Sequence, residues 1–301
     1  MHTRTLRFPG PASPGYTLAP HRRGPGDPCF QIVDGATWRT SLQTSGPVSA
    51  RMARTAPDTV ECRAWGEGAA EFVENLPALL GADDDTSDFR PAHPTVALAH
   101  RRVPHLRIGR TGRVLEALIP AVLEQRVQGV EAFRSWRLLV NRYGTPAPGP
   151  APAAMRVPPP ASAWRSIPSW EYHRANVDPG RMRTLVGCAA RADALERLAA
   201  RPPAEARAAM MSLPGVGVWT AAETAQRALG DADALSVGDY HLAGMIGWTL
   251  LGHAIDDAAM EELLEPQRPH RYRAVRLLEV SRLAYSPRRG PRLARQRISG
   301  L

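Results

Sequence analysis

The first part of the chain alternates apolar and polar residues as β-strands do. Residues 59–65 alternate along their length, and residues 30–33 lead through Asp34-Gly35, a pair typical of a tight hairpin turn, into a second strand over 37–42. Apolar residues at helical spacing follow, with Pro77 as a weak point: Phe72, Leu76, Leu79 and Leu80. The pattern predicts a small α+β domain over residues 1–88, ending in a polar run.

The rest of the chain has the period of α-helices. Residues 112–143 carry two apolar helical faces, and Gly144 is typical of a helix end. We interpret residues 90–100 as a Pro-containing lead-in and residues 145–160, rich in Pro and Ala, as an extended surface connection. Further helices are predicted over residues 179–190, 193–200, 204–211, 219–229, 240–251, 258–264 and 270–283. We therefore expect an all-helical domain over residues 89–287 and a mainly α protein.

The chain ends in a basic segment over residues 288–301, predicted to be a flexible tail that adds non-specific phosphate contacts. Its arginines are Arg288, Arg289, Arg292, Arg295 and Arg297. The most apolar stretch, residues 242–255, is too short to cross a bilayer, and the start of the chain lacks an apolar signal core. We expect a cytoplasmic, nucleoid-associated protein with no membrane partner.

The composition of the chain indicates what kind of partner it binds. Of the 301 residues 44% are hydrophobic, enough for a packed core, and the net charge is +9 with a pI of about 10.4. Such an excess indicates a polyanion, nucleic acid first and an acidic membrane surface second, although charge alone leaves open a basic protein with neither. All 38 basic residues are arginine. Without lysine, no side chain can form a Schiff base.

The cysteines indicate no metal site. Cys29, Cys62 and Cys188 are far apart and odd in number. They make no zinc pattern and cannot supply four ligands to an iron–sulfur cluster. Reduced thiols in a cytosolic protein are the simplest interpretation.

The most informative segment is Leu-Pro-Gly-Val-Gly at residues 213–217, which joins two predicted helices. Its glycines allow a tight turn and close approach to a partner. The free N–H groups that open the next helix form an anion site, which a DNA phosphate fits without base contacts. A plain tight turn between packed helices is the simpler alternative.

A second signal lies downstream, where Leu-Ser-Val-Gly-Asp-Tyr-His-Leu at residues 235–242 opens another predicted helix. Asp239 lies near its start. Taken alone, an aspartate there is interpreted as a helix N-cap.

Together these two segments resemble the helix–hairpin–helix DNA glycosylase superfamily, in its AlkA-like branch of alkyladenine glycosylases. In that family an aspartate follows the hairpin by about twenty residues, and Trp219 and Asp239 have matching spacing. Further matches are residues 124–129 and 268–274. The resemblance covers about residues 110–283. More weakly, the N-terminal α+β segment is similar to the family's extra N-terminal domain.

The resemblance implies a monofunctional DNA glycosylase that flips out alkylated purines, such as 3-methyladenine or 7-methylguanine, and releases them by hydrolysis. Asp239 would be the catalytic residue, stabilising positive charge on the sugar as the glycosidic bond breaks. Lyase-type relatives carry a lysine just after the hairpin, where this chain has Trp219. The absent cysteine cluster argues against the endonuclease III and adenine-mismatch branches.

The resemblance also implies DNA-contacting and base-pocket residues. The DNA-binding set is Leu213, Pro214, Gly215, Val216, Gly217, Thr220, Gln125 and Arg126. The base-pocket set is Trp219, Glu223, Tyr240 and Glu279. Family members insert a side chain at Gln125 or Arg126, but Arg126 is equally a surface arginine. The two aromatics are equally core residues. The two acids would favour a cationic base, accept bonds from an exocyclic amine, or lie on solvated faces.

The implied partner is double-stranded DNA with alkylated bases, bound by a monomer. No cofactor or catalytic metal is implied, apart from a structural monovalent cation at the hairpin carbonyls. The alternative is a non-catalytic helix–hairpin–helix module that only grips the DNA backbone. Binding to a membrane surface through the arginine-rich tail lacks an amphipathic basic helix to support it.

Overall fold

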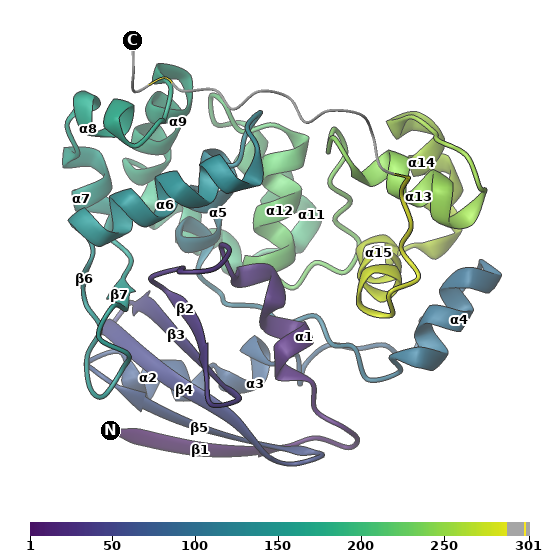
Figure 1. The fold of residues 1–301 in the computed structure, drawn as a ribbon, viewed down its shortest axis with the longest axis horizontal. Helices are drawn as coiled ribbons and strands as arrows, with labels where there is room; N and C mark the ends of the chain where they lie inside the picture. The colour runs from purple at the N-terminus through teal and green to yellow at the C-terminus, as the bar shows by residue number, and fades with distance from the viewer. Residues whose placement is uncertain (288–297, 299–301) are drawn as a thin grey trace.

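The computed structural model describes residues 1–287 and residue 298. Its N-terminal part is a five-stranded antiparallel sheet with the strand order β1-β5-β4-β3-β2 (Figure 1). The strands are β1 (His2–Arg7), β2 (Phe30–Val33), β3 (Ala36–Gln43), β4 (Gly46–Ala56) and β5 (Thr59–Trp65). Helices α2 (Ala69–Glu74) and α3 (Leu76–Leu79) share an apolar core with this sheet.

The local sequence rules account for most of this sheet. Asp34 and Gly35 have φ of 50° and 72°, the left-handed conformations that a two-residue hairpin turn requires, and they join β2 to β3 as predicted. The predicted helix over Phe72 to Leu80 forms as two pieces, and Pro77 lies in the first turn of the second. Strands β1 and β4 were not predicted, because pairing with β5 defines the edge strand β1, and pairing with β3 and β5 defines β4.

Helices make up most of the remaining chain, and each one has bounds close to those predicted where a prediction existed. Before the sheet hairpin lie α1 (Pro14–Leu18) and the 3₁₀ turn η1 (Ala19–His21). The others are α4 (Pro94–Arg102), α5 (Val114–Leu123), α6 (Gly129–Tyr143), α7 (Ala161–Ser166), α8 (Ser169–Arg174), α9 (Pro179–Ala189), α10 (Ala192–Glu196), η2 (Arg197–Ala200), α11 (Pro203–Met211), α12 (Val218–Ala228), α13 (Leu242–Leu250), α14 (Asp257–Leu264), η3 (Glu265–Gln267) and α15 (Arg271–Val280).

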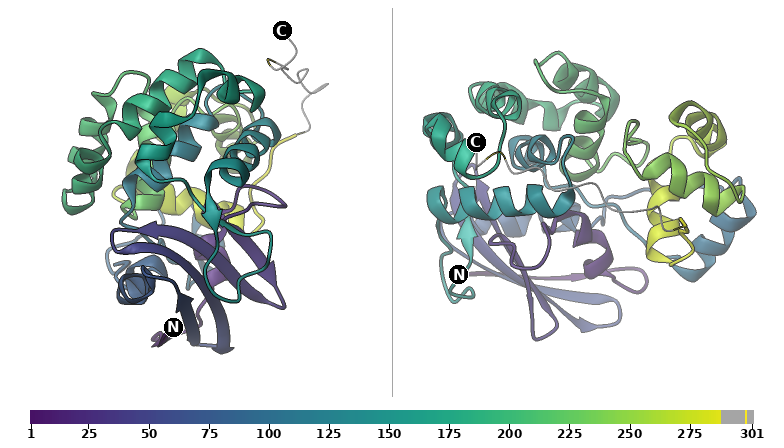
Figure 2. Two further views of the ribbon diagram at one scale, coloured as in Figure 1. Left: turned by 90° about the vertical axis from the view of Figure 1, so that its left-hand side faces the viewer. Right: turned by 45° about the horizontal axis from the view of Figure 1, so that its top comes forward.

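These helices form two groups with separate apolar cores (Figures 1 and 2). The first group surrounds α5, which contacts α6, α9, α10 and α12. Every residue of α5 is buried except Glu116, which pairs with Arg39 of the sheet at 2.5 Å. The second group consists of α4, α13, α14 and α15. The chain passes from the first group to the second between α12 and α13.

The polar run at the end of the N-terminal segment is anchored rather than free. Asp84 pairs with Arg273 of α15, whose side chain is 2% exposed, and Asp88 lies 2.8 Å from the ring of His270. Ion pairs therefore cross the predicted boundary at residue 88. The division into domains at that residue stays a prediction.

Three segments differ from the predictions. Residues 94–102 of the expected lead-in form α4. The connection over 145–160 is not simply extended surface chain, because it contains the strands β6 (Thr145–Pro146) and β7 (Arg156–Val157), and β7 packs against β3 and β4. Met155 and Val157 are each 1% exposed there. The burial of Met155 and Val157 was not predicted because the surrounding residues are mostly Pro and Ala. Helices α7 and α8 were not predicted either.

Two remaining expectations concern the basic tail and a membrane-spanning helix. The basic tail falls on residues 288–301, which lie outside the described residues apart from Ile298. Among the helices of the described part, none is long and apolar enough to cross a bilayer.

Candidate functional site

The hairpin between α11 and α12 has the tight geometry that its glycines predict. Gly215 has φ of 84°, and a Cβ at this residue would lie 2.0 Å from Thr184 Oγ1. Gly217 is the N-cap of α12 and provides no side-chain cap. Since Pro214 and Gly217 are exposed, the amino end of an eleven-residue helix faces solvent. This arrangement suits an anion such as a phosphate.

Gln125, which follows α5, is bonded to the hairpin. Its Nε2 donates to Gly215 O at 2.9 Å and to Thr220 Oγ1 at 2.8 Å. The next residue, Arg126, is exposed and has a left-handed φ of 53°. Of this predicted DNA-binding set, Thr220 and Val216 are 2% and 5% exposed. They support the hairpin from inside and do not present side chains at its surface, so contact with DNA at these two residues would be made by the backbone. The DNA-binding set stays a prediction.

The predicted monovalent cation would be held by carbonyl oxygens of the hairpin. Gly215 O accepts from Gln125, and Leu213 O accepts from Val216 N at 3.0 Å. Both oxygens accept one hydrogen bond within the chain, and each keeps a second lone pair that can ligate a cation. The cation stays a prediction.

Asp239 lies at the end of a tight turn that begins at Ser236. Its N–H donates to Ser236 O at 3.1 Å, and Gly238 has φ of 87°. Asp239 Oδ1 accepts from the N–H groups of His241 and Leu242 at 2.8 and 3.0 Å. Helix α13 therefore begins at Leu242, two residues after the predicted start, because Asp239 satisfies amides of the intervening turn.

The second oxygen of Asp239 is held by the helix that follows the hairpin. Trp219 Nε1 donates to Asp239 Oδ2 at 3.1 Å. Three neutral donors thus fix the carboxylate, which stays partly exposed. Trp219 was predicted to stack on a base, and the structure adds this polar contact, which the residue spacing did not reveal. Asp239 is in this way connected to the first turn of α12, beside the predicted phosphate site.

A series of polar contacts, here called the polar ladder, runs along α12 from Trp219 through Glu223 to Arg227. Glu223, one turn further, accepts from Ser236 Oγ at 2.6 Å and pairs with Arg227 at 2.7 Å. Burial opposes the charge of Arg227, but the attraction of Glu223, Tyr272 and Glu124 together with the Glu223 hydrogen bond outweighs it, so the pKa of Arg227 lies above its ordinary value. Sequence reasoning missed Ser236 and Arg227. The i,i+4 spacing of Glu223 and Arg227 was the available signal.

The other two predicted pocket residues are more exposed. Tyr240 is 66% exposed, and its ring meets the ring of His241 edge-on. Glu279 on α15 is exposed and pairs with Arg276 at 2.5 Å. Neither is a core residue. The structure therefore places Trp219 against Asp239 and Glu223 against Ser236, three residues earlier in the same turn, and it leaves Tyr240 and Glu279 at the surface.

The N-terminal segment reaches this region from the opposite side. Arg227 Nε donates to Pro20 O at 2.9 Å, and Arg276 Nη2 donates to Tyr16 O at 3.3 Å. The turn η1 is thereby bonded to α12, and helix α1 is bonded to α15. Sequence reasoning assigned these residues no role.

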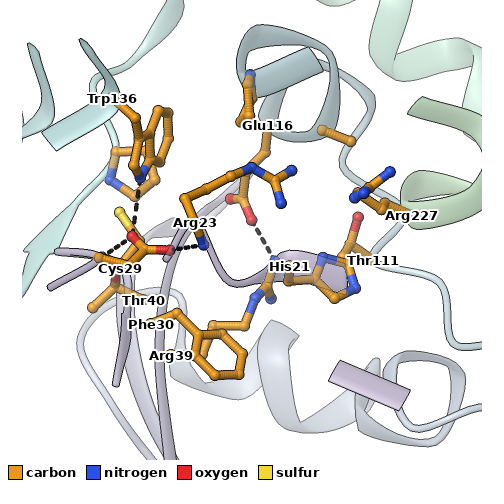
Figure 3. A pocket seen from close by; sticks show the side chains of 14 residues that line it. His21, Arg23, Cys29, Phe30, Arg39, Thr40, Thr111, Glu116, Trp136 and Arg227 are labelled. Carbon is orange, nitrogen blue, oxygen red and sulfur yellow. Dashed lines mark hydrogen bonds and ion pairs between the residues drawn. The ribbon is translucent and has the colours of Figure 1, made fainter. Parts of the chain in front are cut away.

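A polar cavity lies behind this contact, between the sheet and the first helical group (Figure 3). His21, Arg39 and Arg227 line it together with Glu116 and Asp27. Burial first, and then the charge of Arg39, lowers the pKa of His21 well below its ordinary value, so His21 is neutral at pH 7.

Comparison with known proteins shows which proteins this chain is similar to. No family model matches the chain. It is 30% identical over 229 residues to the "Probable bifunctional transcriptional activator/DNA repair enzyme AlkA" of Mycobacterium tuberculosis. The match covers 71% of this chain and 44% of that protein, so the chain spans less than half the length of this curated relative.

Solved structures share the fold over nearly the whole chain. A 3-methyladenine DNA glycosylase from Archaeoglobus fulgidus superposes with a TM-score of 0.79 at 16% identity, covering 93% of this chain and 98% of that one. The fold is that of the helix–hairpin–helix DNA glycosylase superfamily, and the sequence is similar to that of a protein named AlkA. The predicted superfamily fold, mainly α with a small N-terminal α+β part, is confirmed.

Other members with this superfamily fold act on a different base. An 8-oxoguanine glycosylase/lyase from Clostridium acetobutylicum superposes with a TM-score of 0.67 at 11% identity, covering 93% of this chain and 96% of that one. At such identities the likeness concerns the fold alone. The shared fold therefore does not define which base this chain releases.

Proposed function

We propose that this chain is a monofunctional DNA glycosylase that everts alkylated purines of the 3-methyladenine or 7-methylguanine type from double-stranded DNA and releases them by hydrolysis. The observation that carries the proposal is the bond between Trp219 and Asp239. It joins a partly exposed carboxylate to the first turn of α12, whose amino end suits a phosphate. A DNA strand bound at that end would bring a sugar close to Asp239.

The chemistry follows from a fixed negative charge. As the bond between the base and C1′ breaks, positive charge develops on the sugar, and a carboxylate oriented beforehand stabilises it. Asp239 meets this requirement because its hydrogen bonds to His241, Leu242 and Trp219 orient it without a cationic partner. An alkylated purine is itself a good leaving group, so it needs little help from a general acid. Water then attacks the sugar.

The lack of lysine favours hydrolysis over lyase chemistry. A lyase-type enzyme needs an amine that attacks C1′ and forms a Schiff base. This chain has no lysine side chain anywhere, and Trp219 stands just after the hairpin. We therefore expect no strand cleavage at the abasic product, and a monomer that uses no cofactor.

The test is the substitution Asp239→Asn, with the bases released from methylated DNA measured by mass spectrometry. The asparagine side chain can still accept the amide bonds but carries no charge, so release should fall by roughly 10² to 10³-fold while duplex affinity persists. Asp256→Asn is the matched control, because Asp256 caps α14 by accepting from Ala259 N at 2.9 Å. Its release should equal that of the wild type.

Two results would count against the proposal. Equal release by the wild type and Asp239→Asn would remove the catalytic role of Asp239. Salt-sensitive duplex binding with no release of any base would favour the alternative, a non-catalytic DNA-binding module.

A further inference from the structure

A second carboxylate is attached to the turn that carries Asp239. The turn from Ser236 to Asp239 is closed by its own backbone bond of 3.1 Å. At its end Asp239 binds Trp219, and at its start the Ser236 hydroxyl donates to Glu223 Oε1 at 2.6 Å. Both contacts come from α12. The two carboxylates are therefore held at opposite ends of one short turn.

Helix α12 sets the spacing of the two contacts. Trp219 and Glu223 are four residues apart, so their side chains lie on one face, with Cβ atoms about 5 to 6 Å apart. Glu223 therefore projects from the same face of α12 as Trp219, one helical turn along from the side chain that contacts Asp239. The Glu223 side chain is 15% exposed, so water screens its charge little.

The charges around this turn do not cancel. Asp239 is bonded only to neutral donors. Glu223 pairs with Arg227 and is also attracted to the buried Arg23, which itself pairs with Glu124 at 3.0 Å. Next along, His21 is neutral, and on α15 Arg276 and Glu279 pair with each other. Three carboxylates, Asp239, Glu223 and Glu124, against two guanidinium groups, Arg227 and Arg23, leave an excess of one negative charge around this turn.

We propose that Glu223 is a specificity residue that makes this site favour positively charged, N-alkylated purines over neutral damaged purines of similar size. The inference rests on the proposed function. A cationic base gains attraction to the negative excess, whereas a neutral base gains only hydrogen bonds. Ser236 and Arg227 hold the Glu223 carboxylate in place for this role.

Glu223 also balances the buried charge of Arg227, so its replacement will affect stability as well. The measurement must therefore be a ratio that a merely structural role would not change. We would compare two duplexes of one sequence, one with cationic 7-methylguanine and one with neutral hypoxanthine. The selectivity is the ratio of their single-turnover release rates, and the ratio of duplex affinities in an Asp239→Asn background provides it independently.

Two further variants provide the comparison. Glu223→Asp keeps the charge and should keep the selectivity even if release slows. Glu171→Gln is the matched control, because Glu171 on α8 is also a buried acid paired with arginines, Arg142 at 3.0 Å and Arg174 at 3.1 Å. Thermal unfolding of each variant would report the accompanying loss of stability.

In Glu223→Gln we expect the selectivity for 7-methylguanine to fall by about tenfold or more, as loss of one poorly screened charge implies. Equal slowing on both duplexes would refute the inference and leave Glu223 a structural residue. Loss of selectivity in Glu223→Asp to the same extent would also refute the role of charge. A wild type that releases neither base would refute the proposed function itself, and the inference with it.

Discussion

Replacing Gly215 with alanine would show how far the hairpin depends on its glycine. At φ of 84° an alanine Cβ is strained, which costs about 1 to 2 kcal/mol. The Cβ would also lie 2.0 Å from Thr184 Oγ1, so Thr184 must move. Thr184 is 7% exposed, and its hydroxyl donates to Gly180 O at 3.2 Å.

The two costs add to a measurable loss of stability. Turning Thr184 away from its rotamer costs about 1 kcal/mol, and loss of its hydrogen bond costs about 1 kcal/mol more. Gly215→Ala should therefore lower the free energy of unfolding by about 3 to 4 kcal/mol. Gly217→Ala is the control, because Gly217 has φ of −96° and a Cβ there would meet no atom within 4 Å. It should cost less than about 1 kcal/mol.

Urea unfolding of a double-mutant cycle separates the two contributions. In a Thr184→Ala background the 2.0 Å contact with Oγ1 is removed and only a contact of 3.1 Å with the Cβ of residue 184 remains, so Gly215→Ala should cost mainly the backbone part, about 1 to 2 kcal/mol. Full additivity of Gly215→Ala and Thr184→Ala would refute the predicted clash. An unchanged stability of Gly215→Ala alone would refute the left-handed turn as well.

Two further predictions concern catalysis and pH. Trp219→Phe removes the N–H donor to Asp239 Oδ2. Because a hydrogen bond to a charged group contributes about 1.5 to 3 kcal/mol, the substitution should slow base release about tenfold or more. An unchanged single-turnover rate would show that Trp219 does not position Asp239. The folded state holds His21 neutral with a depressed pKa, so below about pH 6.5 the unfolded chain binds more protons and stability should fall with falling pH. In His21→Gln this decline in the unfolding free energy should be shallower, and an equal slope in both proteins would contradict the assignment.

Local rules were enough for the features that carry the family resemblance. The hairpin glycines, the period of the following helix and the Asp34-Gly35 turn each depend on a few adjacent residues. Backbone conformation and helical spacing act over such short distances, so the sequence predicted these features. The spacing between Trp219 and Asp239 was likewise visible, although the contact between them was not.

Contacts between distant segments required the folded molecule. The bond of Glu223 to Ser236, the bond of Arg227 to Pro20 and the burial of Met155 each join elements whose proximity no periodic pattern encodes. The side-chain type shows what a residue can bond to, whereas packing of the cores selects which partner it meets. For that reason the resemblance was enough to propose Asp239 as the catalytic residue, whereas the contacts of Glu223, Ser236 and Arg227 emerged only after the helices were placed against the N-terminal segment.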